Sequence, residues 1–210
     1  MYSLHLDAFF LLHILYVIGI SAESMTGAIS AGRKNMDIFG VMTIASITAL
    51  GGGSVRDMLL GVYPLTWIAQ PGYIITTLCA AVIAIFIANF ITKKIKLFLI
   101  LDALGLVTFA YIGSTIGYQS TDSYTIGIIM GVLTGISGGM MRDILCNDIP
   151  LVLRSELYAS IALIVGALNM LTIYLNLESF IWAIVILVLG LIFRLLAIYK
   201  HVELPKIHYQ

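Results

Sequence analysis

Seven stretches of about 20 mostly apolar residues follow one another along the chain, with short polar segments between them. The hydrocarbon core of a bilayer is about 30 Å thick, so an apolar helix of about 20 residues is long enough to cross it. Of all residues 60% are hydrophobic and 10% are charged, whereas about 25% of a typical soluble domain is charged. The pattern predicts an all-α integral membrane protein with seven transmembrane helices, at residues 6–28, 36–60, 72–91, 97–118, 124–146, 157–175 and 180–199.

The chain also contains an internal repeat, in which matching residues lie 86 positions apart. Shared apolar character would not keep glycines, charges and a proline in one register: Gly52-Gly53 matches Gly138-Gly139, Arg56-Asp57 matches Arg142-Asp143, and Pro64-Leu65 matches Pro150-Leu151. Each copy holds three predicted helices, an odd number, so the copies cross the membrane in opposite directions, as in inverted-repeat transporters. We expect residues 1–92 to form the first repeat, 93–176 the inverted second repeat, and 177–210 the seventh helix and a cytoplasmic tail.

Each copy has a glycine-rich segment beside its Arg-Asp pair, GGGSVRD from Gly51 and SGGMMRD from Ser137. Glycine in apolar helices often serves close packing, but next to charges it favours a helix break that frees backbone carbonyls. Such a break is tolerated in a membrane only beside protein or a water-filled cavity. Free carbonyls and nearby hydroxyls suit transient coordination of a monovalent cation rather than a tight metal site. The predicted ion path comprises Thr48, Gly51, Gly52, Gly53, Ser54, Thr134, Ser137, Gly138 and Gly139.

The two Arg-Asp pairs are candidates for gating or structural ion pairs. Adjacent residues point about 100 degrees apart on a helix, so each pair is expected to find partners elsewhere. In an inverted repeat the simplest arrangement is exchange, Arg56 with Asp143 and Arg142 with Asp57; the alternative places each pair at a membrane interface, where arginine snorkels. Ionisable residues in a membrane span are functional candidates, and two weaker ones are Glu23 and Asp102.

Several classes of function find no support in the sequence. It contains no nucleophile elbow, Walker loop or zinc motif, so we expect neither an enzyme nor a cofactor beyond permeating K⁺ or Na⁺. The formal net charge is zero and there is no basic patch, which argues against nucleic acid as a partner. A scaffold without transport would use the glycines for packing, but it would not explain the duplicated charges.

Lys and Arg gather in the loops and end on one side of the predicted helices. These residues are Arg33, Lys34, Lys93, Lys94, Lys96, Arg154, Lys200 and Lys206. Because cytoplasmic loops carry an excess of Lys and Arg, we expect the N-terminus outside and the C-terminus in the cytoplasm.

The doubled motif within seven helices arranged 3+3+1 resembles the prokaryotic trimeric intracellular cation (TRIC) channels. The resemblance covers nearly the whole chain and departs from the motif at Ser137, which replaces a glycine. It implies a homotrimer, in a bacterial inner membrane, whose protomers each pass potassium through a pore lined by the second and fifth helices, both kinked at their glycines. The resemblance does not identify a lipid ligand.

Bacterial members of the same broad family are also described as glycine transporters. The alternative function is therefore secondary transport of a small zwitterion, with its carboxylate on a half-helix N-terminus and its amine on freed carbonyls. The sequence has no obvious proton-coupling acid at the midplane unless Glu23 or Asp102 serves. This favours the channel.

Overall fold

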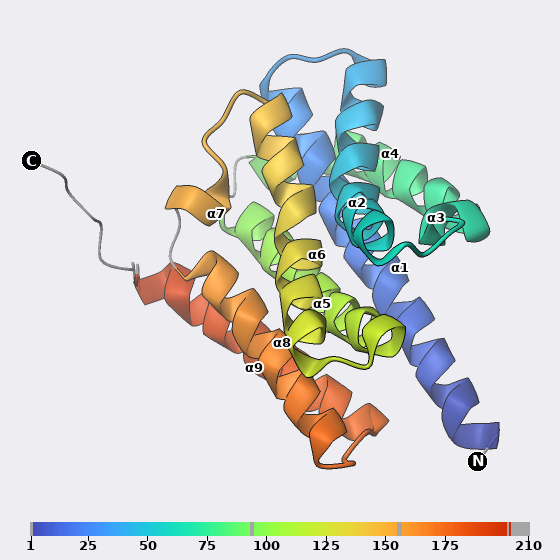
Figure 1. Cartoon of the computed structure of the whole chain (residues 1–210). Helices are drawn as coiled ribbons and strands as arrows, with labels where there is room; N and C mark the ends of the chain where they lie inside the picture. Colours follow the sequence, from blue (N-terminus) through green and yellow to red (C-terminus); the bar gives the residue numbers. More distant parts are fainter. Residues whose placement is uncertain (1, 93–94, 155–156, 201, 203–210) are drawn as a thin grey trace, which may run out of the picture.

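The structure is a computed structural model that describes residues 2–92, 95–154, 157–200 and 202. Within these ranges it contains helices and no strand (Figure 1). The helices are α1 (Tyr2–Arg33), α2 (Ile38–Leu60), α3 (Thr66–Ala69), α4 (Gly72–Thr92), α5 (Ile95–Thr121), α6 (Tyr124–Leu145), α7 (Leu151–Arg154), α8 (Tyr158–Tyr174) and α9 (Phe180–Lys200). Lys93, Lys94 and Lys206, on which the expected orientation partly rests, lie outside the described residues.

The long helices coincide with the predicted apolar stretches, while the one-turn helices α3 and α7 were not predicted. Among the described residues, α1 from Phe10, α2, α5, α6 and α9 are long and apolar enough to cross a membrane. The described apolar parts of α4 and α8 are shorter. The chain is a multi-pass membrane protein with an all-helical fold.

The helices that carry the two glycine motifs end in the same way. Gly61 follows α2 with φ 67°, and Asn147, 86 positions later, follows α6 with φ 54°. Glycine and asparagine are the residues that most readily adopt this left-handed conformation at a helix end. In both copies the backbone then folds back, because the N–H of Val62 donates to Asp57 O at 2.9 Å and that of Asp148 to Asp143 O at 2.8 Å.

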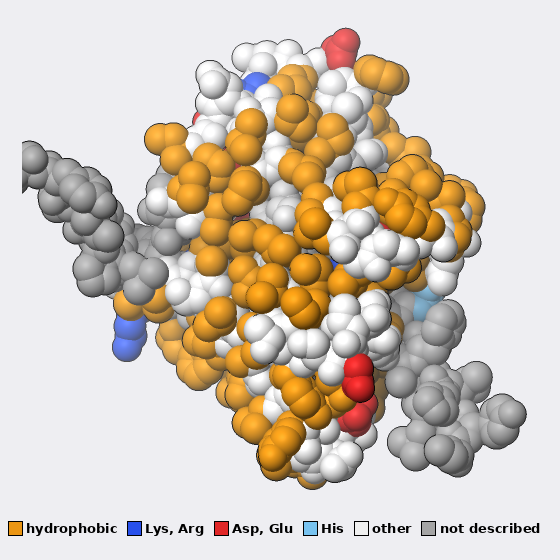
Figure 2. Space-filling view, viewed as in Figure 1, with side chains coloured by type: hydrophobic (Ala, Val, Ile, Leu, Met, Phe, Trp, Pro, Cys, Tyr) orange, Lys and Arg blue, Asp and Glu red, His pale blue; other side chains and the backbone are white. Residues whose placement is uncertain are grey.

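The bundle is built around α1 and α5, which pack against each other. α1 also contacts α2 and α4, and α5 also contacts α6, α8 and α9 (Figure 1). The face in Figure 2 is mostly hydrophobic, and the charged side chains seen on it lie near its edges. Phe39, Phe86 and Ile181 are 78%, 83% and 71% exposed, as expected for side chains that face lipid.

Candidate functional site

The two glycine motifs meet where α2 crosses α6. A Cβ on Gly52 would collide with the backbone oxygen of Thr134, and a Cβ on Gly138 would collide with that of Thr48. These are the same contact in the two copies, because 86 positions separate Thr48 from Thr134 and Gly52 from Gly138. The close approach of the two backbones therefore requires a glycine on each helix.

The expected helix breaks are absent, and this part of the sequence-based prediction is wrong. α2 is continuous over Ile38–Leu60 and α6 over Tyr124–Leu145. Packing explains Gly52 and Gly138 instead, since each lies against the backbone of the other helix. The nearby hydroxyls are held within their own helices, each donating to the carbonyl four residues earlier: Thr48 at 2.6 Å, Ser54 at 2.8 Å, Thr134 at 2.6 Å and Ser137 at 2.5 Å.

The last glycine of each motif makes room for an arginine and a tyrosine. A Cβ on Gly53 would lie 2.8 Å from the Tyr16 hydroxyl oxygen and 3.7 Å from Arg56 Nη2. A Cβ on Gly139 would lie 3.2 Å from the Tyr158 hydroxyl oxygen and 3.6 Å from Arg142 Nη2. Gly51 has a different neighbour, the sulfur of Met141.

Arg56 pairs with its own neighbour, so the expected exchange of partners between the copies is wrong. Arg56 Nε and Nη2 donate to Asp57 Oδ1 at 2.9 and 2.6 Å, and both side chains are fully buried. Asp57 Oδ2 accepts the backbone N–H of Thr66 at 2.7 Å, and Arg56 Nη2 also donates to the Thr66 hydroxyl at 3.0 Å. Both side chains turn toward the loop after α2. They therefore meet, although adjacent residues point in different directions from the helix axis.

The second copy repeats this arrangement. Arg142 Nε donates to Asp143 Oδ1 at 2.8 Å, and Asp143 Oδ2 accepts the backbone N–H of Leu151 at 2.8 Å. Each aspartate thus receives an N–H from the start of a one-turn helix, α3 or α7, and holds that helix against the end of α2 or α6. The signal for these helices was Pro64-Leu65 and its copy Pro150-Leu151, which directly precede or begin them.

Arg142 has additional partners, which include both weaker candidates. Its Nη1 donates to Asp102 Oδ1 at 2.9 Å and to the Thr26 hydroxyl at 3.0 Å, and lies 3.8 Å from Glu23 Oε2. Glu23 and Asp102 are 1% and 0% exposed, so both are buried within the helix bundle. We call Glu23, Asp102, Arg142 and Asp143 the acidic cluster.

The acidic cluster is not a metal centre. Among the described residues, no three His, Cys, Asp or Glu side chains are placed to hold a metal ion. The guanidinium of Arg142 contacts Asp102, Asp143 and, at longer range, Glu23. It takes the position that a cation would need, and it also lies over the ring of Phe98, 5.1 Å from the centroid.

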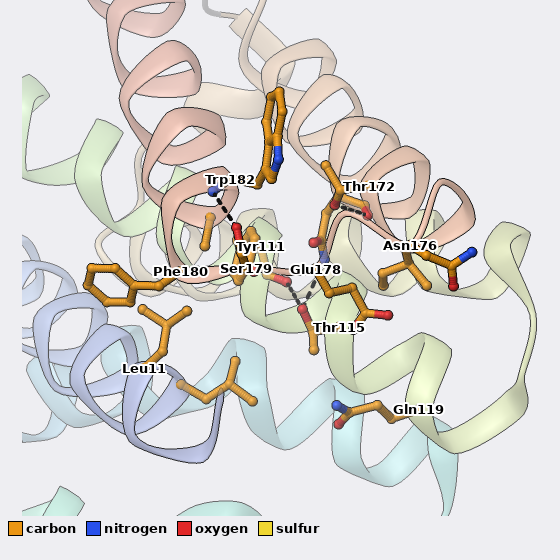
Figure 3. Close-up of a pocket in the computed structure, with 14 residues that line it drawn as sticks. Leu11, Tyr111, Thr115, Gln119, Thr172, Asn176, Glu178, Ser179, Phe180 and Trp182 are labelled. Atoms are coloured by element: carbon orange, nitrogen blue, oxygen red, sulfur yellow. Dashed lines mark hydrogen bonds between the residues drawn. The ribbon is translucent and has the colours of Figure 1, made fainter. Parts of the chain in front are cut away.

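A cavity of about 510 Å³ lies at a different place, among α1, α5, α8 and α9. Figure 3 shows polar and aromatic side chains around it, among them Thr115, Gln119, Glu178 and Trp182. Asn169 also lines it and donates to the hydroxyls of Ser114 and Thr115, at 2.9 Å each. None of the residues predicted for the ion path lines this cavity, and the sequence reasoning did not find it.

The comparisons with known proteins cover nearly the whole chain. The family model that matches is described as glycine transporter and aligns with residues 13–89 and 99–174, two segments that begin 86 positions apart. The inner membrane protein YadS of Escherichia coli is 33% identical over 199 residues, which are 93% of this chain and 95% of YadS.

Solved structures agree in fold. One, described as the basis for conductance through TRIC cation channels, is 35% identical with a TM-score of 0.85, covering 94% of this chain and 98% of the other. The TRIC trimeric intracellular cation channel orthologue from Rhodobacter sphaeroides is 31% identical with a TM-score of 0.83, covering 91% and 99%. The chain therefore belongs to the prokaryotic family of TRIC channels, which the glycine-transporter family model also describes.

Proposed function

We propose that this protein is a passive channel for monovalent cations, chiefly potassium. The observation that carries the proposal is the similarity to a solved TRIC cation channel at 35% identity and a TM-score of 0.85 over 94% of this chain. At that level the packing of the helices is shared, and the proposal extends the sharing to the activity. A passive channel of this kind would need no cofactor.

The proposed ion path follows the crossing of α2 and α6 in each protomer. Gly52 and Gly138 bring the two helices together there, and Ser54 and Ser137 lie half-buried beside the crossing. Both hydroxyls donate within their own helix, and Ser54 Oγ also accepts from Trp67 Nε1 at 2.9 Å, which leaves one lone pair on Ser54 and two on Ser137. They would coordinate a passing cation weakly, which conduction requires. The two Arg-Asp pairs would hold the ends of these helices against α3 and α7.

The proposed assembly is a homotrimer that lies in the bacterial inner membrane. The solved orthologue from Rhodobacter sphaeroides is described as trimeric, and the relative YadS as an inner membrane protein. All seven long helices would cross the bilayer, with the N-terminus outside and the C-terminus in the cytoplasm. Residues 1–92 and 93–176 would be inverted repeats, followed by 177–210; the reciprocal glycine contacts and the two segments matched by the family model support this division.

A second candidate function is secondary transport of glycine or a similar zwitterion. The description of the matching family model favours it. The acidic cluster also combines a buried cation with buried carboxylates, the groups that would receive the two ends of a zwitterion.

Measurements on reconstituted protein distinguish the channel from the glycine transporter. We expect purified protein in planar bilayers to give unitary currents whose reversal potential follows a potassium gradient, because a passive pore needs no other energy source. Proteoliposomes made from the same preparation should show no uptake of labelled glycine down a glycine gradient. Saturable glycine uptake without unitary currents would exclude the channel and support the transporter.

A further inference from the structure

The acidic cluster has no counterpart in the first copy. The residue 86 positions before Asp102 is Tyr16, and the residue 86 positions after Glu23 is Phe109. A Cβ on Gly105 would meet the carboxylate of Glu23, and a Cβ on Gly19, its match in the first copy, would meet the ring of Phe109. The position beside Gly105 thus holds a carboxylate, whereas the equivalent position beside Gly19 holds an aromatic ring.

Three carboxylates share the guanidinium of Arg142 in this cluster. The side chains of Arg142, Asp102, Glu23 and Asp143 are 0%, 0%, 2% and 9% exposed. Removing unbalanced charges from water is costly, so a buried cluster with excess negative charge favours the uptake of a cation or a proton.

Two other guanidinium groups lie over aromatic rings in this region. Arg33 lies over Phe98, 5.3 Å from the centroid, and Arg194 of α9 lies over the ring of Tyr158 at 4.7 Å. Tyr158 of α8 faces the cluster with its hydroxyl, beside Gly139. The charged and titratable groups around Glu23 are therefore Arg142 and Asp143 from α6, Asp102 from α5 and Tyr158 from α8, with Arg33 over Phe98 and Arg194 over Tyr158.

The donors available to each carboxylate point to Glu23 as the site of uptake. Asp143 accepts hydrogen bonds at both oxygens, from Arg142 Nε and from the backbone of Leu151, each at 2.8 Å. Asp102 accepts from Arg142 through Oδ1 at 2.9 Å, while its Oδ2 is buried without a hydrogen-bond partner. Glu23 Oε1 is buried without a hydrogen-bond partner, and Oε2 lies 3.8 Å from Arg142, beyond hydrogen-bond distance. Glu23 is thus the least compensated carboxylate.

The Thr26 hydroxyl supplies a second, independent indication. A hydroxyl has one proton to donate and two lone pairs that accept. Thr26 Oγ1 is 2.8 Å from the backbone oxygen of Glu23, 3.2 Å from Glu23 Oε2 and 3.0 Å from the donor Arg142 Nη1. If its one proton goes to the nearer backbone oxygen, the contact with Oε2 needs a proton on Glu23. A protonated carboxyl supplies that proton, so that both contacts of Thr26 Oγ1 with Glu23 are hydrogen bonds.

We propose that Glu23 binds a proton in the folded protein. This buried proton site lies beside Arg142, and the matching residue of the first copy, Arg56, has no such site beside it. The carboxyl O–H donates to Thr26 Oγ1, and Arg142 is shared by Asp102 and Asp143. A cation is disfavoured because the guanidinium already occupies the space between the carboxylates. The inference goes beyond the proposed function and does not depend on it, because proton binding is measured without transport.

Infrared difference spectroscopy tests the site directly. Purified protein in lipid at neutral pH should show the C=O band of a protonated carboxyl that moves when H₂O is exchanged for D₂O. Glu23→Gln should remove this band, whereas Asp148→Asn, at an exposed pair with Lys34 of 2.9 Å, should keep it. Absence of the band in the wild type, or its survival in Glu23→Gln, would overturn the proposal.

Stability against pH gives a second readout, and its wild-type measurement serves even if Glu23→Gln folds poorly. A folded state that binds one proton more than the unfolded state loses stability as pH rises, by up to about tenfold in the folding equilibrium constant per pH unit. We expect this slope at neutral pH in the wild type and a flatter one in Glu23→Gln. A stability that depends on Na⁺ or K⁺ concentration at constant pH, without the slope, would assign a metal cation instead and contradict a proton.

Discussion

Arg142→Ala is expected to abolish stable folding, while Arg56→Ala is expected to leave a weakened but folded protein. Removing one partner of a buried ion pair costs roughly 3 to 5 kcal/mol, because the other charge stays buried without compensation. Arg56→Ala strands one carboxylate, that of Asp57. Arg142→Ala removes the cation shared by Glu23, Asp102 and Asp143, so its cost exceeds that range even when one of the three holds a proton.

Thermal unfolding and size-exclusion chromatography in detergent would measure the difference. Lys34→Ala is the matched control, because it breaks an ion pair with Asp148 whose side chains are 36% and 45% exposed. Exposed pairs contribute about 0 to 1 kcal/mol, so this variant should behave almost like the wild type. Equal losses of stability in Arg56→Ala and Arg142→Ala would contradict the expectation that the acidic cluster makes Arg142 the more important of the two arginines.

Gly52→Ala and Gly138→Ala are expected to destabilise the protein and to reduce its current, each by forcing α2 and α6 apart. The added methyl group meets the backbone oxygen of Thr134 or Thr48, which cannot move aside as a side chain could. Overpacking costs about 1 to 3 kcal/mol, and occasionally more. The two variants should resemble each other, because their contacts are equivalent in the two copies.

Gly32→Ala provides the control for this experiment. Gly32 lies in α1, and a Cβ there would meet no atom within 4 Å. Gly32 is the second-last residue of α1, where alanine is tolerated at least as well as glycine, so this variant should be as stable as the wild type or slightly more so. The packing account fails if Gly52→Ala unfolds at the same temperature as Gly32→Ala.

The helices were predictable from the sequence because about 20 apolar residues in a row have few alternatives in a membrane. The repeat was predictable because glycines, charges and a proline recur at one spacing. The helices α3 and α7 were not, since four residues show no helical periodicity. They depend on the backbone N–H groups that Asp57 and Asp143 accept, and only the structure places these groups.

The contacts of the candidate residues could not be predicted from the sequence. Gly52 and Gly138 lie at the crossing, yet they pack against backbone instead of breaking their helices. The expected pairing of Arg56 with Asp143 was wrong because it relied on the angle between neighbouring residues of a helix. Long side chains at a helix end can turn into the following loop, and there Arg56 meets Asp57. The approach of Glu23 and Asp102 to Arg142 depends on how α1, α5 and α6 pack, which no local pattern records.

The most direct test of the central claim is a blocking experiment at the crossing of α2 and α6. Ser137→Cys places a thiol on α6 beside Gly138, and a cationic thiol reagent should reduce its unitary potassium current in a planar bilayer. The wild type is the control, because neither of its own cysteines belongs to the proposed ion path. Cys79 is exposed on α4, and Cys146 is buried. The account predicts block of Ser137→Cys and an unchanged wild-type current. An unchanged current in Ser137→Cys, with modification of the thiol verified by mass, would contradict an ion path at this crossing.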